Sequence, residues 1–299
     1  TRLVSDWSSD VCSSDLGGHA ERDLPGAEES SQVGSLRIVL DVEAECAGGE
    51  ARLGERDGAD GDPPQGQSSH GIHGCETRRM ELYEVMRSTA AIREFTDDPL
   101  PDDVLARILD HARFAPSGGN RQGAHIVLVT DAETRKALAR LTEPASRRYA
   151  AQNAKGQVPW NPLEPGPTAE ELATAEAPAF MLEPVFRAAV LLVVCVDLAA
   201  VAATDQDLDR LGIVGGASVY PLVWNILLAA RQEGFGGTFT TMAVAEEPAV
   251  KELLGIPEEY AVAAVVPLGK PVKQPTKLRR QPVAEFVTWQ RFDGEPFEA

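Results

Sequence analysis

The sequence contains few aromatic residues, few cysteines and no long apolar run. Aromatic side chains make up 6% of the 299 residues. The four cysteines, at positions 12, 46, 75 and 195, show no C-x-x-C spacing, which argues against a structural zinc site or a disulfide framework. This cysteine usage fits a reduced, cytoplasmic setting. No stretch of about 18 uninterrupted apolar residues occurs, so we expect no membrane-spanning helix and no membrane partner.

Basic residues are also scarce. The chain has 28 Lys and Arg against 46 Asp and Glu, a net charge of -18. Such an acidic balance argues against nucleic acid as the main partner, because a phosphate backbone is bound by clustered cations. The G-x-G-x-x-G, P-loop, H-E-x-x-H and G-x-S-x-G motifs are missing as well, so the dinucleotide-fold, nucleotidase, metalloprotease and hydrolase classes lose their sequence support, and no metal site is expected.

The composition changes near residue 80. Trp7 is the single aromatic residue of positions 1–79, and a segment this poor in apolar bulk cannot offset its ordering entropy, so we interpret it as largely disordered. Its start, WSSDVCSSDL at 7–16, resembles translated sequencing-adapter DNA, in which case Met80 would be the natural start. A genuine acidic tail is the alternative. We expect the folded domain to cover residues 80–299.

Regular hydrophobic patterns begin at Met80. β-Branched apolar runs predict buried strands, and apolar residues at helical spacing predict helices, with Asp102 as the N-cap of one of them. Residues 142–187 are rich in proline and predict an irregular excursion of the kind that covers a site. Strands that alternate with helices indicate an α/β or α+β sandwich. The predicted strands are 124–130, 188–196 and 260–268, and the main helices are 80–89, 102–112, 131–141, 218–232 and 248–254.

Four segments, taken in order, resemble the nitroreductase family of FMN-dependent enzymes. They are RSTAAIREF at 87–95, APSGGNRQ at 115–122, the long helix and glycine-rich turn at 218–241, and the helix end and strand at 253–269. The resemblance implies an α+β fold, a three-layer α/β/α sandwich with a central, mostly antiparallel sheet. It also implies a homodimer with the flavin at the interface. The helix 218–232 is a candidate for the interface centre, or equally a core helix of one chain.

The activity that this resemblance implies is hydride transfer from NADH or NADPH to flavin N5 and on to a small electron-poor acceptor, by a ping-pong mechanism. Nitroaromatics, quinones and activated alkenes are acceptors of this kind. No catalytic side chain is required, because flavin N5 carries the chemistry. Two alternatives stay open: a non-catalytic flavin-binding module, and a relative that performs reductive dehalogenation or flavin breakdown.

The resemblance also assigns cofactor-binding residues, because FMN presents an anionic phosphate at one end and a ring that becomes anionic on reduction at the other. Arg93 matches the cation at the pyrimidine edge of the ring, and Asn120 matches the amide at the ring edge. A backbone N–H at the 240–241 turn matches the donor to N5. The full set comprises Arg87, Ser88, Arg93, Ser117, Asn120, Gln122, Thr240, Thr241, Arg279 and Arg280.

Two departures from the family pattern affect this assignment. Ala90 and Ala91 stand where a dense cationic run is expected, so the register of the Arg87-Ser88 phosphate motif stays open, and Gly123-Ala124 replace the usual Pro-Trp. Simpler interpretations also stay open: Arg93 as a surface arginine, Asn120 as a turn residue, and Arg279-Arg280 as a solvated charge cluster. Cys195 lies in an apolar strand and is expected to be a small core residue.

Overall fold

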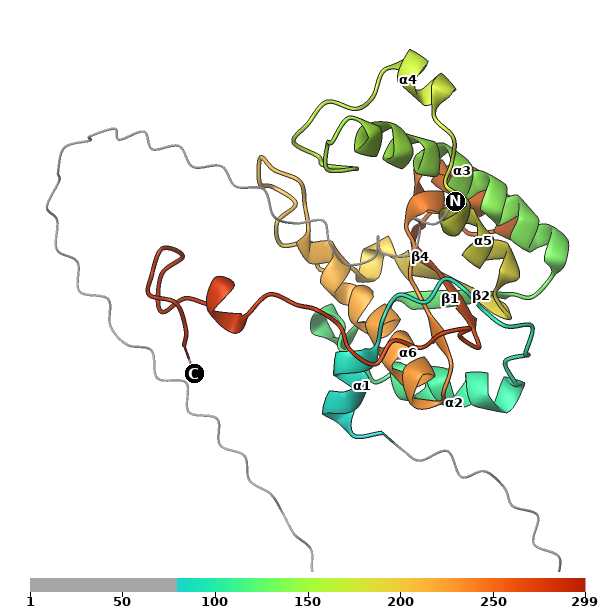
Figure 1. Ribbon diagram of the computed structural model, residues 1–299, viewed down its shortest axis with the longest axis horizontal. Coiled ribbons are helices and arrows are strands. Elements are labelled where there is room, and N and C mark those ends of the chain that lie inside the picture. The colour runs from blue at the N-terminus through green and yellow to red at the C-terminus, as the bar shows by residue number, and fades with distance from the viewer. Residues whose placement is uncertain (1–79, 299) are drawn as a thin grey trace, which may run out of the picture. The chain divides into compact units, whose positions relative to one another are not determined.

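A computed structural model describes residues 80–298 of the chain (Figure 1). The expectations for positions 1–79 lie outside the described residues. Within 80–298, no helix combines the length and the hydropathy needed to cross a membrane. The helices are α1 (Leu82–Ser88), α2 (Asp102–Ala112), α3 (Ala132–Ala154), α4 (Ala169–Thr174), α5 (Ala179–Arg187), α6 (Tyr220–Gln232) and α7 (Glu247–Leu254). The strands are β1 (Ala124–Val129), β2 (Val190–Asp197), β3 (Gly236–Gly237) and β4 (Tyr260–Gly269).

The four strands form one antiparallel sheet in the order β1-β2-β4-β3. The three strands predicted from sequence agree with β1, β2 and β4 to within about two residues at each end. Strand β3 was not predicted, because two glycines carry no alternation of apolar and polar side chains.

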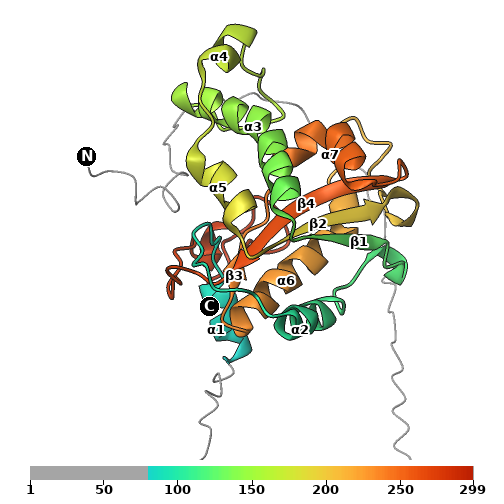
Figure 2. The same cartoon turned by 90° about the vertical axis from the view of Figure 1, so that its right-hand side faces the viewer.

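Helices cover both faces of the sheet, as Figure 2 shows: α2 and α6 lie against one face, and α3, α5 and α7 against the other. Alternate residues of β2 serve the two faces. Leu192 and Val194 pack with the α2 and α6 side, whereas Leu191, Val193 and Cys195 pack with the α3 side. A strand buried on both faces must be apolar throughout, which explains the unbroken VLLVVCV run. Each such side chain contributes about 1.5–3 kcal/mol of transfer free energy.

Helix α6 is the element that positions the site. Its inner side buries Val223, Ile226, Leu227 and Ala230 against the sheet. The helix ends at Gln232, and Gly234, whose φ of 77° lies in the left-handed region, lets the chain turn into β3. The predicted helix at 218–232 is therefore confirmed from Tyr220 onward, and a short 3₁₀ turn (Val214–Ser218) precedes it.

Helix α3 is longer than predicted. The sequence prediction ended it near residue 141 because Pro144 and the polar residues around it interrupt the pattern, but the helix continues to Ala154. The hydroxyls of Thr142 and Ser146 donate to the carbonyls of Leu138 and Thr142, both at 2.9 Å, within this stretch. The irregular excursion therefore begins only after α3.

The N-cap prediction for α2 was wrong. Pro101 occupies the cap position and makes no side-chain cap bond, whereas Asp102 lies inside the first turn. An acidic residue in the first turn still stabilises the helix, through the partial positive charge of the free N–H groups there.

Candidate functional site

The segment 91–96, which contains Arg93, is held along the edge of the sheet. Ala91 pairs with Gly237, and the N–H of Ile92 donates to the Gly237 carbonyl at 2.8 Å. On the other side, Thr96 N–H donates to the Lys270 carbonyl at 2.9 Å. Gly236 is required for this close approach, because a Cβ there would lie 2.7 Å from Cγ1 of Ile92. With Ile92 buried, the backbone that carries the next residue is fixed.

Arg93 projects on the opposite side from Ile92 and stays accessible to solvent. Neighbouring protein nevertheless desolvates the guanidinium and so lowers the pKa of Arg93, while the phenol of Tyr149 on α3 acts in the raising direction. An arginine remains charged under these conditions. Within residues 80–298 it forms no ion pair with a carboxylate. Arg93 is thus a partly desolvated cation available to an anionic ligand.

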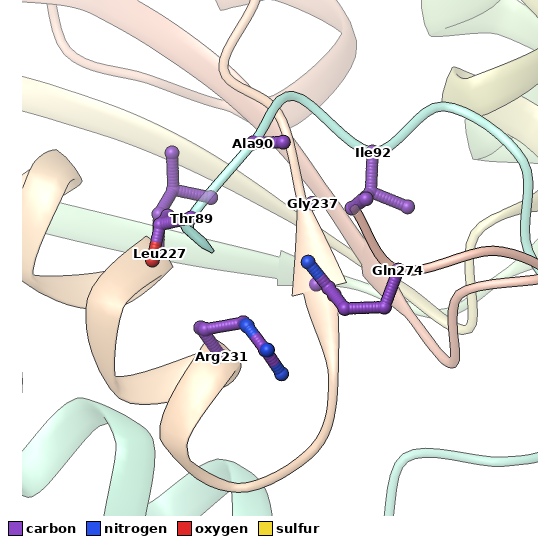
Figure 3. Close-up of a pocket in the computed structure, with 8 residues that line it drawn as sticks. Thr89, Ala90, Ile92, Leu227, Arg231, Gly237 and Gln274 are labelled. Atoms are coloured by element: carbon purple, nitrogen blue, oxygen red, sulfur yellow. The ribbon is translucent and has the colours of Figure 1, made fainter. Parts of the chain in front are cut away.

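A small pocket opens beside this segment, where α1 and α6 both end (Figure 3). Ser88, previously assigned to the phosphate motif, is buried at its border, and its hydroxyl donates to the Glu84 carbonyl at 2.7 Å. Arg87 lies exposed in the last turn of α1. The pocket is lined by Thr89, Ala90, Ile92, Leu227, Arg231, Gly236, Gly237 and Gln274.

Two polar residues of this pocket, Arg231 and Gln274, were missed by the sequence analysis. Arg231 Nε donates to Ser88 Oγ at 3.1 Å, and Gln274 Nε2 donates to the Ser88 carbonyl at 3.1 Å. Their partners lie 143 and 186 positions away along the chain, so no local spacing pattern could reveal them. The one sequence signal was the pair Ala90 and Ala91, which stand where the family pattern has cations. Their lack of charge indicates that a cation for the phosphate has to come from another part of the chain.

The loop 117–122 carries the second group of predicted residues. Ser117 Oγ accepts from the N–H of Gln122 at 2.9 Å, which closes the loop. Asn120 and Gln122 have φ values of 53° and 52°, the left-handed region that asparagine tolerates better than most residues. Gly118 lets the loop pack tightly, since a Cβ there would lie 2.7 Å from Ala202. Asn120 is exposed at the tip.

The turn after β3 contains Thr240 and Thr241. The N–H of Thr240 donates to the Val265 carbonyl at 2.8 Å and is therefore already used within the sheet. No backbone acceptor is recorded within the described chain for the N–H of Thr241. Of the two predicted residues, Thr241 thus has the amide that a ligand can reach.

The basic tail follows Gln274. Arg279 and Arg280 are exposed, and Arg280 Nη1 donates to the Arg279 carbonyl at 2.6 Å. Because Gln274 is anchored at the pocket, these cations lie within a few residues of chain from it.

The predicted residues fall into two groups at opposite ends of the sheet. Ala124 follows the 117–122 loop and is aligned, across β2, with Ala261 near the start of β4. Gly237, which pairs with the segment that carries Arg93, is aligned with Leu268 near the end of β4. The seven residue steps along β4 from Ala261 to Leu268 span about 23 Å. Helix α6 gives the same result: Ser218, which Gly118 approaches, precedes its first residue, and Arg231 lies in its last turn, about 20 Å away.

The available donors suit a flavin nucleotide. The Arg93 end of the sheet offers the cations Arg93 and Arg231 and the amide N–H of Gln274. The 117–122 loop offers the side-chain amide of Asn120, and the Thr241 N–H lies on the turn between β3 and α7. A phosphate needs the cations, and the ring edge needs groups that both donate and accept. Among the described residues, no cluster of three histidine, cysteine or acidic side chains could hold a metal ion.

Comparison with curated proteins finds relatives among flavin and nicotinamide enzymes. The NADPH-flavin oxidoreductase of Vibrio harveyi is 28% identical over 208 residues, covering 68% of this chain and 71% of that protein. The NADH dehydrogenase of Thermus thermophilus is 28% identical over 205 residues, covering 67% of this chain and 91% of that protein.

Solved structures give the same fold. Iodotyrosine deiodinase bound to FMN and 3-iodo-L-tyrosine superposes with a TM-score of 0.54 at 22% identity, over 71% of this chain and 100% of that one. The Vibrio harveyi NADPH:FMN oxidoreductase complexed with NAD+ gives a TM-score of 0.50 at 25% identity, over 71% and 78%. Residues 86–270, more than half of the chain, match the Nitroreductase family, and the protein therefore belongs to that family.

Proposed function

We propose that the protein is an NAD(P)H-dependent flavin oxidoreductase that binds FMN and reduces a small electron-poor acceptor. Family membership and the relatives named as NADPH-flavin oxidoreductase and NADH dehydrogenase support the reaction class. The observation that carries the proposal is Arg93, a partly desolvated cation that lies on a hydrogen-bonded backbone segment and has no carboxylate partner in the described chain.

FMN, when bound, supplies N5 as a hydride acceptor from NADH or NADPH and as a donor to a nitroaromatic, quinone or activated alkene. The chain's own part is positioning and charge. Arg93 stabilises negative charge at the pyrimidine edge of the ring, and the Thr241 N–H orients the N5 edge. Because one ring face serves both substrates in turn, the kinetics are ping-pong.

A second copy of the chain completes the site. The Arg93 group and the Asn120 group lie at opposite ends of α6, too far apart for one flavin ring within one chain. Helix α6 exposes Tyr220 (40%) and Trp224 (41%) one turn apart, a large aromatic surface for a solvent-facing side. Two α6 helices packed antiparallel about a two-fold axis bring the Arg93 end of each chain to the Asn120 end of its partner. This arrangement supports the homodimer, and the helices on both faces of the sheet support the three-layer α/β/α sandwich.

The C-terminal segment supports the same assembly. Every recorded hydrogen bond of residues 282–298 stays within that segment, and Figure 1 shows it projecting to one side of the sheet. Three of its aromatic side chains are open to solvent, Phe286, Trp289 and Phe292, and Phe292 is fully exposed. An apolar arm of this kind gains stability by packing on a partner.

Anaerobic reduction tests the proposal directly. The purified protein is expected to be yellow and to bleach when NADH or NADPH is added without oxygen. Yellow protein that resists bleaching with either nucleotide favours a non-catalytic flavin-binding module. Colourless protein that takes up no FMN on reconstitution rejects the function.

Reductive dehalogenation is a second candidate, supported by one observation. Human iodotyrosine deiodinase 1 is 23% identical over 221 residues, covering 70% of this chain. Halide release from a halogenated phenol by the reduced protein would favour this reaction over nitro or quinone reduction, and a panel of nitro, quinone, enone and halogenated acceptors compares them.

The flavin-binding domain corresponds to residues 80–299, in a cytoplasmic protein. Removing residues 1–79 is expected to leave flavin content and melting temperature nearly unchanged, since the aromatic-poor segment offers little to bury. Loss of either property on truncation would show that the segment contributes to the domain.

A further inference from the structure

The residues that follow α1 lack the dense cationic run that the resemblance predicts, so Arg87 is the one cation in the last turn of that helix. Ala90 and Ala91 carry no charge. A dianionic phosphate left without charge-assisted donors in a partly desolvated site is unfavourable. If the chain binds FMN, a residue outside this run must supply the positive charge.

Arg231 is placed to do so. It reaches the pocket from the last turn of α6, and Figure 3 shows its guanidinium and the Gln274 amide nitrogen extending toward the same space from opposite sides, beside Ala90 and Gly237. The bond from Arg231 Nε to Ser88 Oγ at 3.1 Å fixes the side chain and leaves its terminal nitrogens without a recorded partner in the described residues.

No carboxylate neutralises this cation within residues 80–298. Glu233, the nearest acidic residue in sequence, pairs instead with Arg107 of α2, with Nη2 and Oε2 3.1 Å apart. Arg231 is thus a cation without a carboxylate partner among the described residues, although the protein as a whole is acidic.

We propose that Arg231 is the phosphate-facing cation of the flavin site, with Gln274 as a second donor, in place of the charged run missing at Ala90 and Ala91. This assignment rests on the proposed function, because it requires FMN as the ligand. Ser88 is then a positioning residue that holds Arg231 through its hydroxyl. The basic tail that starts beyond Gln274 closes the same phosphate end.

A purely structural role for Arg231 makes a different prediction. A cation in the last turn of α6 stabilises the helix dipole and ties α6 to Ser88, and neither effect depends on a ligand. Loss of a structural arginine lowers the melting temperature and weakens every flavin equally. Loss of a phosphate-binding arginine weakens only flavins that carry a phosphate.

The test compares FMN with riboflavin, which shares the ring and ribityl chain but lacks the phosphate. Apo-protein is titrated with each flavin by fluorescence quenching, in wild type, Arg231→Ala, Arg231→Gln and Arg231→Lys. Glutamine keeps a donor for Ser88 without the charge, and lysine keeps the charge without the planar fork. Arg140→Ala, an exposed position on α3, is the matched control for loss of one positive charge.

Wild type and Arg140→Ala are expected to prefer FMN. Arg231→Ala and Arg231→Gln are expected to lower the ratio of the riboflavin Kd to the FMN Kd about tenfold or more, with riboflavin binding unchanged and Arg231→Lys intermediate. The preference should also weaken with salt in wild type and much less in Arg231→Ala.

Each other outcome is decisive. An unchanged ratio in Arg231→Ala, or an equal loss of both flavins, overturns the assignment while the proposed function stands. A wild type that binds neither flavin overturns the proposed function and this assignment together.

Discussion

At the edge of the sheet, the position of Arg93 is set by the residues beside it in the chain and not by hydrogen bonds of its own side chain. Arg93 owes its position to Ile92, which is buried, and to the backbone bonds of residues 92 and 96. The guanidinium itself makes no recorded hydrogen bond within residues 80–298. The backbone that carries this charge is thus fixed before a ligand binds, which limits the reorganisation that binding requires.

Arg93→Ala is expected to weaken FMN binding about tenfold or to lower the flavin reduction potential, because a charge-assisted contact to the ring's anionic edge is lost. Kd by fluorescence and the potential by dye equilibration measure the two effects, with Arg140→Ala as control. If both quantities match wild type, Arg93 is a surface arginine and its assigned role is wrong.

Cys195 illustrates a buried group without a catalytic role. Burial, and secondarily the charge of Glu247, raise the pKa of its thiol to about 11, against an opposing effect of Lys251. A raised pKa means that the folded state holds the proton more tightly. The stabilisation is complete below the unfolded value near 9.0 and is lost as pH rises through about 11.

Native Cys195 is therefore expected to resist iodoacetamide at pH 8 and to label only after unfolding, since the thiolate is the reactive form. Peptide mapping by mass spectrometry separates this thiol from those at positions 12, 46 and 75. Labelling of native Cys195 as fast as of a free thiol in urea would contradict the burial described for β2.

The segment 201–213, between β2 and α6, depends on one carboxylate. Asp205 is buried and accepts from the N–H groups of Ile213 and Val214, at 2.8 and 3.2 Å, and from Arg210 at 2.9 Å. The Ile213 N–H is the main cause that lowers the pKa of Asp205 below its usual value; Arg210 and Val214 act in the same direction. The bonds are present above the unfolded pKa and are lost as pH falls through the lowered one.

Asp205→Asn is expected to speed hydrogen exchange at the amides of Ile213 and Val214 at neutral pH, because the charged acceptor is gone. Asp207→Asn, in the same loop but exposed, is the control. Equal protection in the two variants would show that the loop is held by other contacts.

The elements that could be predicted from sequence are those with a strong period. Strands β2 and β4 and helix α6 follow from apolar runs and helical spacing, and Arg93 follows from its motif. The extension of α3 past Pro144 was missed because proline is usually a helix stop, yet the remaining turns are held by buried residues such as Ser146 and Ala151. Arg231 was missed because its role arises from contacts between α1, α6 and the chain after β4, which a local pattern does not contain.

The molecule as a whole explains why its binding residues are divided. Helix α6 has one end at the 117–122 loop and the other at the Arg231 pocket. Its outer side carries Tyr220 and Trp224, and Phe239 (43% exposed) stacks beside Tyr220 with ring centroids 6.1 Å apart. Aromatic clusters of this kind are typical of the centre of a protein interface.

Trp224→Asp is expected to convert the proposed dimer to a folded monomer and to release flavin, because a charge is placed at the centre of the proposed interface without a partner. Light scattering and circular dichroism measure assembly and folding. Leu163→Asp adds the same charge at another exposed apolar residue and serves as control. A Trp224→Asp protein that stays dimeric and yellow would place the interface elsewhere.

The division of the site between two chains can be tested by complementation. Arg93→Ala damages one group of binding residues and Asn120→Ala the other, so each variant alone is expected to hold little FMN. When the two variants are co-expressed and pair at random, half of the dimers are mixed, and each mixed dimer contains one undamaged composite site. The account predicts that flavin content rises to about a quarter of the wild-type value. Flavin content no higher than the average of the separate variants would contradict it.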